Sequence, residues 1–201
     1  MHELIVFLNN IKFEWNFIEF MAVCFSILYV ILAAKENIYC WGAAIISVCL
    51  YIYLCYSAKL YAETILQIFY LLMAFLGYYN WKKIDLDSEQ SSIKEWNIIK
   101  HILIIILGAT LSFIIGFLLT NYTDAEIAIL DSFTTVFSLF ATYLVIQKII
   151  ENWLYWIVID IAAVYLYFDR GLLLTSLLFI IYTMIAVFGY FNWIKKLEKK
   201  C

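Results

Sequence analysis

Seven long apolar stretches constrain this chain more than any other feature of its sequence. A helix needs about 20 predominantly apolar residues to cross the hydrocarbon core of a bilayer. The chain is 66% hydrophobic and 14% charged, a composition that excludes a water-soluble enzyme. We therefore predict an all-α polytopic membrane protein with seven transmembrane helices. They are expected near residues 17–34, 38–57, 60–81, 98–119, 130–148, 151–169 and 171–194.

Basic residues fall mainly on one side of the expected membrane. An odd number of spans puts the termini on opposite sides, and ten of the 13 Lys and Arg residues then share a side with the C-terminus. The other three are Lys12, Lys59 and Arg170. The positive-inside rule predicts a cytoplasmic C-terminus and an outside N-terminus.

The first residues show acids but no basic region followed by a small-residue cleavage site. We therefore expect no removable signal peptide and a first span that is retained. Apolar residues recur at helical spacing between Leu4 and Ile18. This pattern predicts either a short interfacial helix or an extension of the first span.

An internal repeat divides the chain. A shift of 112 residues without a gap brings Gly77–Trp81 onto Gly189–Trp193, and 14 of the 43 residues from 41 to 83 are identical to their counterparts. The same shift pairs Phe25 and Ser26 with Phe137 and Ser138. Unbroken register through Trp, Asn and Gly indicates a duplication.

The repeat predicts a single membrane domain over residues 1–201 with a SWEET-like 3+1+3 plan. The first three-helix repeat covers 17–83, the linker helix 98–119 and the second three-helix repeat 129–195, and Lys82–Asn97 is expected to be a solvated linker. Equivalent lysines at the ends of both repeats lie on the same side only if one further span separates the repeats. Parallel repeats of this kind are one plan of secondary transporters, in which the substrate binds between the repeats.

The sequence offers no recognisable catalytic or cofactor-binding motif. Its five cysteines form no CxxC pair, its two histidines are far apart, and its six glycines form no phosphate-binding loop. A single arginine and a net charge of −3 give no basic surface for nucleic acid. We expect no enzyme activity, no metal, no cofactor and no nucleic-acid partner.

Polar side chains within apolar spans are the candidate site residues, because burying them in a membrane is costly. In the third span Gln67 and Tyr70 share one face with Gly77, and Tyr182 occupies the matching face of the seventh span with Gly189. We expect the two glycines to serve helix packing. Gln67, Tyr70 and Tyr182 are predicted to contact a ligand.

The sixth span holds the densest cluster of such residues. Asn152, Trp153, Trp156 and Asp160 recur at helical spacing, which places two indoles, an amide and a carboxylate on one broad face. Paired indoles suit a flat aromatic ring, the more so if it is cationic, and amides suit hydroxyl groups. The cluster favours an uncharged or cationic ring compound over a phosphorylated one.

Two further tryptophans have a simpler interpretation. Trp81 and Trp193 stand at the ends of their spans next to Lys83 and Lys195. We expect them to be aromatic-belt residues at the membrane interface.

Several segments of the second half resemble one known family, the PnuC nicotinamide riboside transporters. The resemblance covers essentially the whole chain and is strongest from residue 151 onward. The similar segments are Glu151–Trp156, Asp160, Leu166–Tyr167, the segment around Tyr182 and Gly189-x-x-x-Trp193.

The resemblance implies a SWEET-like 3+1+3 fold, a homotrimer, and facilitated diffusion of nicotinamide riboside across the bacterial inner membrane. It also implies that a separate cytosolic kinase traps the substrate by phosphorylation for NAD biosynthesis, with membrane lipid as the other partner. The resemblance implies that the substrate is contacted by the residues matching the motif, namely Asn152, Trp153, Trp156 and Tyr182. Gln67 and Tyr70 are their expected counterparts in the first repeat.

Other functions stay open on sequence grounds. Thiamine is also a flat cation, and relatives with this fold look specific for thiamine or riboflavin. Proton coupling is possible through Glu19, Glu63, Asp131 and Asp160. A scaffold or sensor subunit would leave the polar face of the sixth span unexplained.

Overall fold

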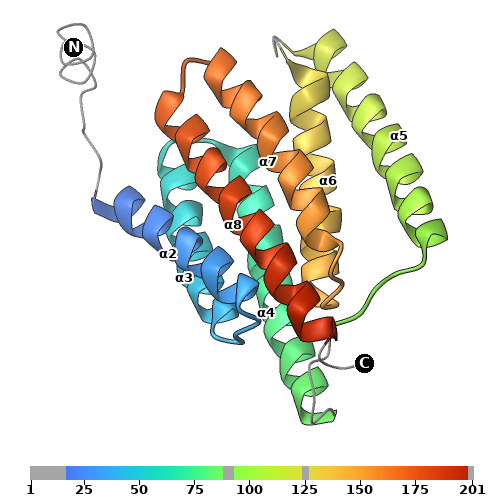
Figure 1. Ribbon diagram of the computed structural model, residues 1–201. Helices are drawn as coiled ribbons and strands as arrows, with labels where there is room; N and C mark the ends of the chain where they lie inside the picture. Colours follow the sequence, from blue (N-terminus) through green and yellow to red (C-terminus); the bar gives the residue numbers. More distant parts are fainter. Residues whose placement is uncertain (1–16, 88–92, 124–126, 199–201) are drawn as a thin grey trace, which may run out of the picture.

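The computed structural model describes residues 17–87, 93–123 and 127–198, and this part of the chain is helical, as predicted. Figure 1 shows the helices, numbered from α2. Residues 4–16 of the expected N-terminal amphipathic segment lie outside the described residues. The helices are α2 (Phe17–Ala34), α3 (Cys40–Ser57), α4 (Tyr61–Asp87), α5 (Ile98–Tyr122), α6 (Ala128–Ile146), α7 (Asn152–Asp169) and α8 (Leu173–Glu198).

Five of these helices are long and apolar enough to cross a membrane, namely α2, α3, α5, α6 and α8. The other two, α4 and α7, carry the polar candidates Gln67, Asn152 and Asp160. The structure thus supports a multi-pass membrane protein, and three of the polar candidates lie on the two less apolar helices.

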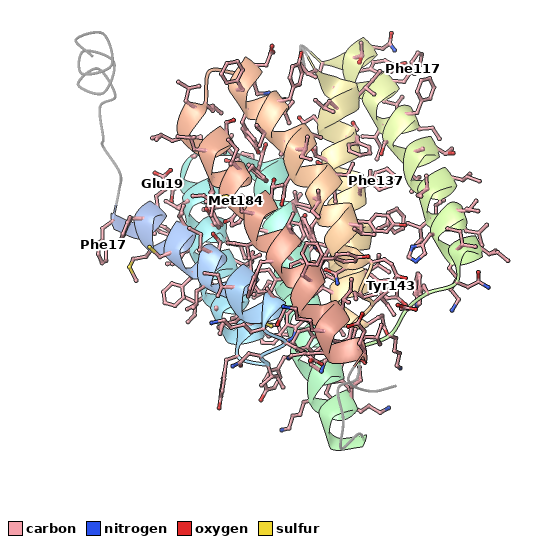
Figure 2. All side chains as sticks on the ribbon, viewed as in Figure 1. Phe17, Glu19, Phe117, Phe137, Tyr143 and Met184 are labelled. Carbon is pink, nitrogen blue, oxygen red and sulfur yellow. The ribbon has the colours of Figure 1, made fainter. Side chains whose placement is uncertain are left out.

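The outer surface of the bundle is apolar. Figure 2 shows side chains projecting from the outside of the bundle, among them Phe17, Phe117 and Met184. These three are 73%, 56% and 60% exposed. A lipid-facing surface needs this composition, because lipid tails solvate apolar side chains.

The helices form two groups of three, with α5 outside both. In the first group α3 packs against α2 and α4, and in the second α7 packs against α6 and α8. The groups meet through two contacts, α2 with α8 and α4 with α6 (Figure 1). Helix α5 packs along α6, and its His101 also contacts Tyr155 of α7 at 3.1 Å. Each central helix therefore lies between the other two helices of its group.

Contacts within the two groups recur at an offset of 112 residues. The rings of Trp41 and Trp81 are 5.5 Å apart at 88°, and those of Trp153 and Trp193 are also 5.5 Å apart at 88°. Trp81 and Trp193 then meet across the groups at 6.2 Å. Both are 0% exposed, so the prediction that they are belt residues is wrong. Hydropathy placed them near span ends but could not reveal that their faces turn inward.

Two glycines make the tryptophan packing possible. A Cβ atom on Gly77 would lie 2.3 Å from the Trp41 ring, and one on Gly189 would lie 2.8 Å from the Trp153 ring. Both distances are shorter than a normal van der Waals contact. The expectation that these glycines serve packing is confirmed.

The same offset recurs in hydrogen bonds between the groups. The Asn80 side-chain amide donates to the Ile146 carbonyl at 2.7 Å, and that of Asn192 donates to the Ala34 carbonyl, also at 2.7 Å. The indole N–H of Trp81 and that of Trp193 likewise donate to carbonyls of the opposite group, at 3.0 and 3.1 Å. Side chains of α4 therefore bind carbonyl groups in the last turn of α6, and side chains of α8 bind those in the last turn of α2.

The segment between α4 and α5 is less solvated than predicted. Helix α4 continues to Asp87, and Ile93 is only 1% exposed. The backbone of Lys94 donates to the Lys148 carbonyl at 3.0 Å and accepts from the Ile150 N–H at 2.9 Å. The expectation of a solvated linker is wrong for this part, because its backbone pairs with the loop between α6 and α7.

Candidate functional site

Two candidate residues lie at the start of α7, in the packed interior. Asn152 is 0% exposed, and its Nδ2 donates to the Ile149 carbonyl at 2.6 Å. Trp153 is 2% exposed and packs against Gly189 and Trp193. Among the described residues, Asn152 Oδ1 and Trp153 Nε1 have no hydrogen-bond partner.

Trp156 and Asp160 lie one and two turns beyond Asn152 on α7, and both face the centre of the molecule. Trp156 is partly buried and contacts both hydrophobic clusters, the larger one around the tryptophans and a smaller one around Phe137 and Ile159. Asp160 is 3% exposed. The α7 face predicted from sequence is therefore turned inward.

The two candidate tyrosines bridge the two groups in matching ways. The Tyr182 hydroxyl on α8 hydrogen bonds with Ser26 on α2 at 2.5 Å, and the Tyr70 hydroxyl on α4 hydrogen bonds with Ser138 on α6 at 2.6 Å. These pairs are related by the 112-residue offset. They place hydroxyl groups at both contacts where the groups meet.

The candidate residues do not all lie together. Asp160 and Tyr182 lie on α7 and α8, which pack against each other. Gln67 is half-buried one turn before Tyr70 on α4. Asn152 and Trp153 lie at the end of α7 that holds the tryptophan cluster.

Sequence reasoning missed several residues at the meeting of the groups. Ser26 and Ser138 stood out only as matching positions of the repeat, although each bonds a candidate tyrosine. Tyr167 on α7 stacks on Phe179 of α8, with ring centroids 5.2 Å apart and an interplanar angle of 11°. Polar side chains at matching repeat positions are the signal that would have found the two serines.

A buried ion pair joins the two interhelical loops at one end of the molecule. The Lys148 ammonium lies 3.2 Å from a Glu36 carboxylate oxygen, with Lys148 1% and Glu36 8% exposed at the side chain. Lys196 binds the other carboxylate oxygen at 2.9 Å, and Lys148 lies 4.8 Å above the Trp81 ring. Glu36 and Lys148 are 112 residues apart, so the pair joins equivalent positions of the two groups. This end of the molecule is therefore closed.

Within residues 17–87, 93–123 and 127–198, no group of three or more His, Cys, Asp or Glu side chains is arranged to hold a metal ion.

The comparison with known families agrees with this arrangement. A family model described as nicotinamide mononucleotide transporter matches residues 16–195. The chain belongs to this transporter family. Every candidate residue and all of α2 to α7 lie within the matched range.

Named relatives of this transporter come from several bacteria. The chain is 27% identical to the nicotinamide riboside transporter PnuC of Neisseria mucosa, over 89% of this chain and 72% of the relative. It is 25% identical to PnuC of Escherichia coli K12, over 94% of this chain and 89% of the relative. The resemblance to PnuC transporters is confirmed.

A solved structure shares the transporter's fold. The crystal structure of the vitamin B3 transporter PnuC superposes with a TM-score of 0.73 at 27% identity, over 98% of this chain and 87% of that one. The bundle in Figure 1 is therefore that of a transporter family, which is not an enzyme family.

Proposed function

We propose that this chain carries nicotinamide riboside across the bacterial inner membrane by facilitated diffusion. Its membership of a transporter family whose curated relatives are named for this substrate is the main support. A separate cytosolic kinase then phosphorylates the substrate and retains it for NAD biosynthesis.

The proposed binding site uses the inward faces of α4, α7 and α8. Trp156 stacks on the pyridinium ring, where cation–π attraction adds to the apolar contact. Buried Asn152 Oδ1 and Trp153 Nε1, which lack partners among the described residues, suit hydroxyl groups of the ribose. Asp160 balances the ring's positive charge, and Gln67, Tyr70 and Tyr182 complete the site.

The charges favour an unphosphorylated substrate over the mononucleotide. A phosphate group is normally bound by Arg or Lys. Lys148 is already paired with Glu36, and Arg170 is paired with Asp131 at 3.0 Å. A phosphorylated ligand would compete with these carboxylates for its counter-charge.

The proposed topology is the 3+1+3 plan with seven spans. Residues 17–83 and 129–195 form the parallel repeats and 98–119 lies in the linker helix, a division supported by the contacts that recur at the 112-residue offset. The N-terminus faces outward, the C-terminus faces the cytoplasm, and the assembly is a homotrimer. In this orientation the Glu36–Lys148 pair closes the cytoplasmic end.

Transport is proposed to be uncoupled from protons. Of the four acids that sequence suggested, Glu19 and Glu63 are exposed and Asp131 pairs with Arg170, which leaves Asp160 as the buried one. Uptake into proteoliposomes should therefore continue after a protonophore collapses the proton gradient. Loss of uptake would make Asp160 the first residue to test as a proton carrier.

Calorimetric titration of the detergent-purified protein is the deciding experiment for the substrate. We expect saturable binding of nicotinamide riboside, at least tenfold tighter than binding of thiamine, riboflavin or nicotinamide mononucleotide. Tighter binding of thiamine or riboflavin would reassign the substrate within vitamin transport. No binding by folded protein would contradict the proposal.

A further inference from the structure

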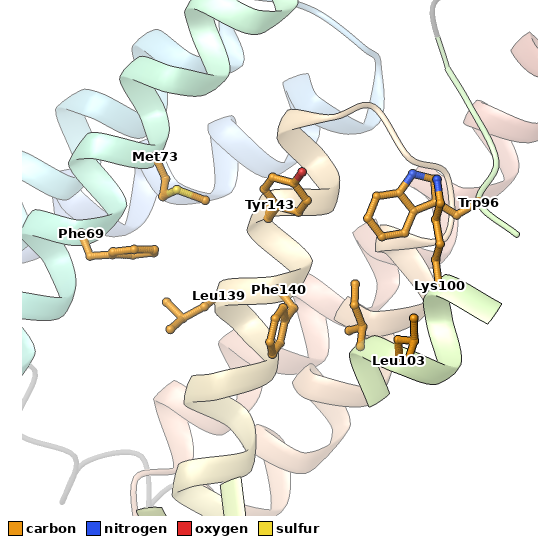
Figure 3. Close-up of a pocket in the computed structure, with 9 residues that line it drawn as sticks. Phe69, Met73, Trp96, Lys100, Leu103, Leu139, Phe140 and Tyr143 are labelled. Carbon is orange, nitrogen blue, oxygen red and sulfur yellow. The ribbon is translucent and has the colours of Figure 1, made fainter. Parts of the chain in front are cut away.

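A groove on the outside of the molecule stands apart from the proposed substrate site. Helices α4 and α5 both stand beside α6, yet α4 and α5 do not pack against each other. The groove between them has a volume of about 590 Å³. In Figure 3, α4 contributes Phe69 and Met73, α6 contributes Leu139, Phe140 and Tyr143, and the α5 side contributes Trp96, Lys100 and Leu103.

The groove is polar at one end and apolar along the rest of its length. Trp96, Lys100 and Tyr143 lie toward the start of α5 and the end of α6. Lys100 stands 5.1 Å above the Trp96 ring. Residues nearer the middle of the helices, such as Leu103 and Phe140, are apolar. Trp and Tyr next to a Lys at a helix end are typical of the membrane interface.

One basic side chain lines the groove at this end. Lys100 lines the groove, and Lys94, in the segment leading to α5, is exposed. Of the nearby acids, Glu151 accepts from the Trp96 backbone N–H at 3.2 Å and faces His101 at 3.5 Å, while Glu95 is exposed. Lys100 is thus the charged side chain that lines the groove itself.

We propose that this groove binds an anionic phospholipid, with an acyl chain along α4, α5 and α6 and the phosphate headgroup against Lys100. Basic positions between membrane helices recognise anionic headgroups, and the apolar length suits a chain of methylene groups. The lipid fills the space that separates α5 from α4. It thereby covers the side of α5 that faces α4, while α5 itself packs along α6 and contacts α7 near its start through His101.

Fluorescence quenching by brominated lipids tests the site directly, because Trp96 lines it. The protein is reconstituted in phosphatidylcholine vesicles that contain a small, equal fraction of either dibrominated phosphatidylglycerol or dibrominated phosphatidylcholine. The Trp96 signal is the difference between the parent and Trp96→Phe. We expect phosphatidylglycerol to quench this signal at least twofold more than phosphatidylcholine.

Substitutions of exposed lysines give the matched controls. Lys100→Gln should abolish the preference, Lys100→Arg should retain it, and Lys83→Gln at the end of α4 should leave it unchanged. Equal quenching by both lipids, or a preference that survives Lys100→Gln, would overturn the proposal. Protection of Trp96 from both lipids would also overturn it, and would instead assign the groove to a contact between copies of the chain.

Discussion

Helices α3 and α7 make the same contacts in their two groups, but they carry different side chains on the inward face. Trp41 and Trp153 pack on equivalent glycines and tryptophans with the same ring geometry. Where α7 has Asn152, Trp156 and Asp160, α3 has Cys40, Ala44 and Val48 at the matching positions. The packing frame is thus shared by both groups, whereas the chemistry is concentrated in one.

This difference has a physical reason. A repeated packing frame requires the same large and small residues at the same positions, because a tryptophan needs a glycine opposite it. An asymmetric ligand presents a different surface to each group of helices, so its site gains nothing from two identical faces. Variants of the frame should therefore lower stability, and variants of the site should lower binding affinity.

The largest effect is expected where the two groups are joined by charge. Lys148→Met removes the buried ammonium group that lies 3.2 Å from the Glu36 carboxylate, and breaking one partner of a buried pair costs about 3–5 kcal/mol. Detergent unfolding followed by circular dichroism measures the loss. The exposed pair is the control, since Arg170→Met should cost about 1 kcal/mol or less.

An exchange of the pair sharpens the comparison between the groups. Because residues 36 and 148 are equivalent positions of the repeat, the double variant Glu36→Lys with Lys148→Glu keeps one ion pair between the same two positions. It should recover part of the lost stability, and not all of it, because Lys196 then faces a lysine at position 36. If the exchange is no better than Lys148→Met, the two positions are not equivalent.

The next effect tests the frame itself. Gly77→Ala and Gly189→Ala push a Cβ into a tryptophan ring, and overpacking costs about 1–3 kcal/mol. The loss should be larger at Gly77, where the Cβ contact is 2.3 Å against 2.8 Å at Gly189. Thermal unfolding in detergent compares the two variants.

A glycine on α3, Gly42, serves as the matched control for Gly77 and Gly189. Gly42 is helical and has nothing within 4 Å of an added Cβ, so Gly42→Ala should be neutral or stabilise the protein by about 0.5–1 kcal/mol. Destabilisation by Gly42→Ala as large as that by Gly77→Ala would show that contact with tryptophan is not the cause.

A smaller effect is expected in the site on α7. Trp156→Ala removes the proposed ring contact and should weaken nicotinamide riboside binding about fivefold to thirtyfold, corresponding to about 1–2 kcal/mol of cation–π attraction. Titration calorimetry measures it. Tyr143→Ala, on an exposed tyrosine of α6 outside the proposed site, is the control. Unchanged affinity in folded Trp156→Ala would remove this residue from the site.

The smallest effect compares the two tyrosines. Tyr70→Phe and Tyr182→Phe each lose one hydrogen bond to a serine, so each should cost about 1 kcal/mol of stability. Binding should fall more for Tyr182→Phe, because Tyr182 lies on α8, which packs against α7, the helix that carries Trp156 and Asp160. Equal losses of affinity would mean that the ligand lies midway between the groups.

Local patterns in the sequence were enough to predict the helices and the buried face of α7. The α2 bounds agree with the hydropathy prediction of residues 17–34, since apolar length and helical period are properties of a short segment. The inward face of α7 was likewise predicted from the spacing of Asn152, Trp156 and Asp160. The C-terminal end of α4 was not predicted, because hydropathy falls at Lys82 while the helix continues to Asp87.

Contacts between segments that are distant in the sequence could not be predicted from such local patterns. Nothing local to Glu36 or Lys148 identifies its partner, since that pairing depends on how two loops meet after the helices have packed. The burial of Trp81 and Trp193 was decided in the same way, by glycines that lie close to their neighbours only in the folded bundle.

Hydropathy and the repeat by themselves determined that this chain is a helical membrane protein built from two related halves. Only the tertiary structure decided which faces turn inward, which charges pair, and that α5 packs along α6 and leaves a groove beside α4. The physical reason is that apolar periodicity distinguishes buried from exposed faces only against water. In a bilayer both faces of a helix are apolar, and shape complementarity selects the face that packs.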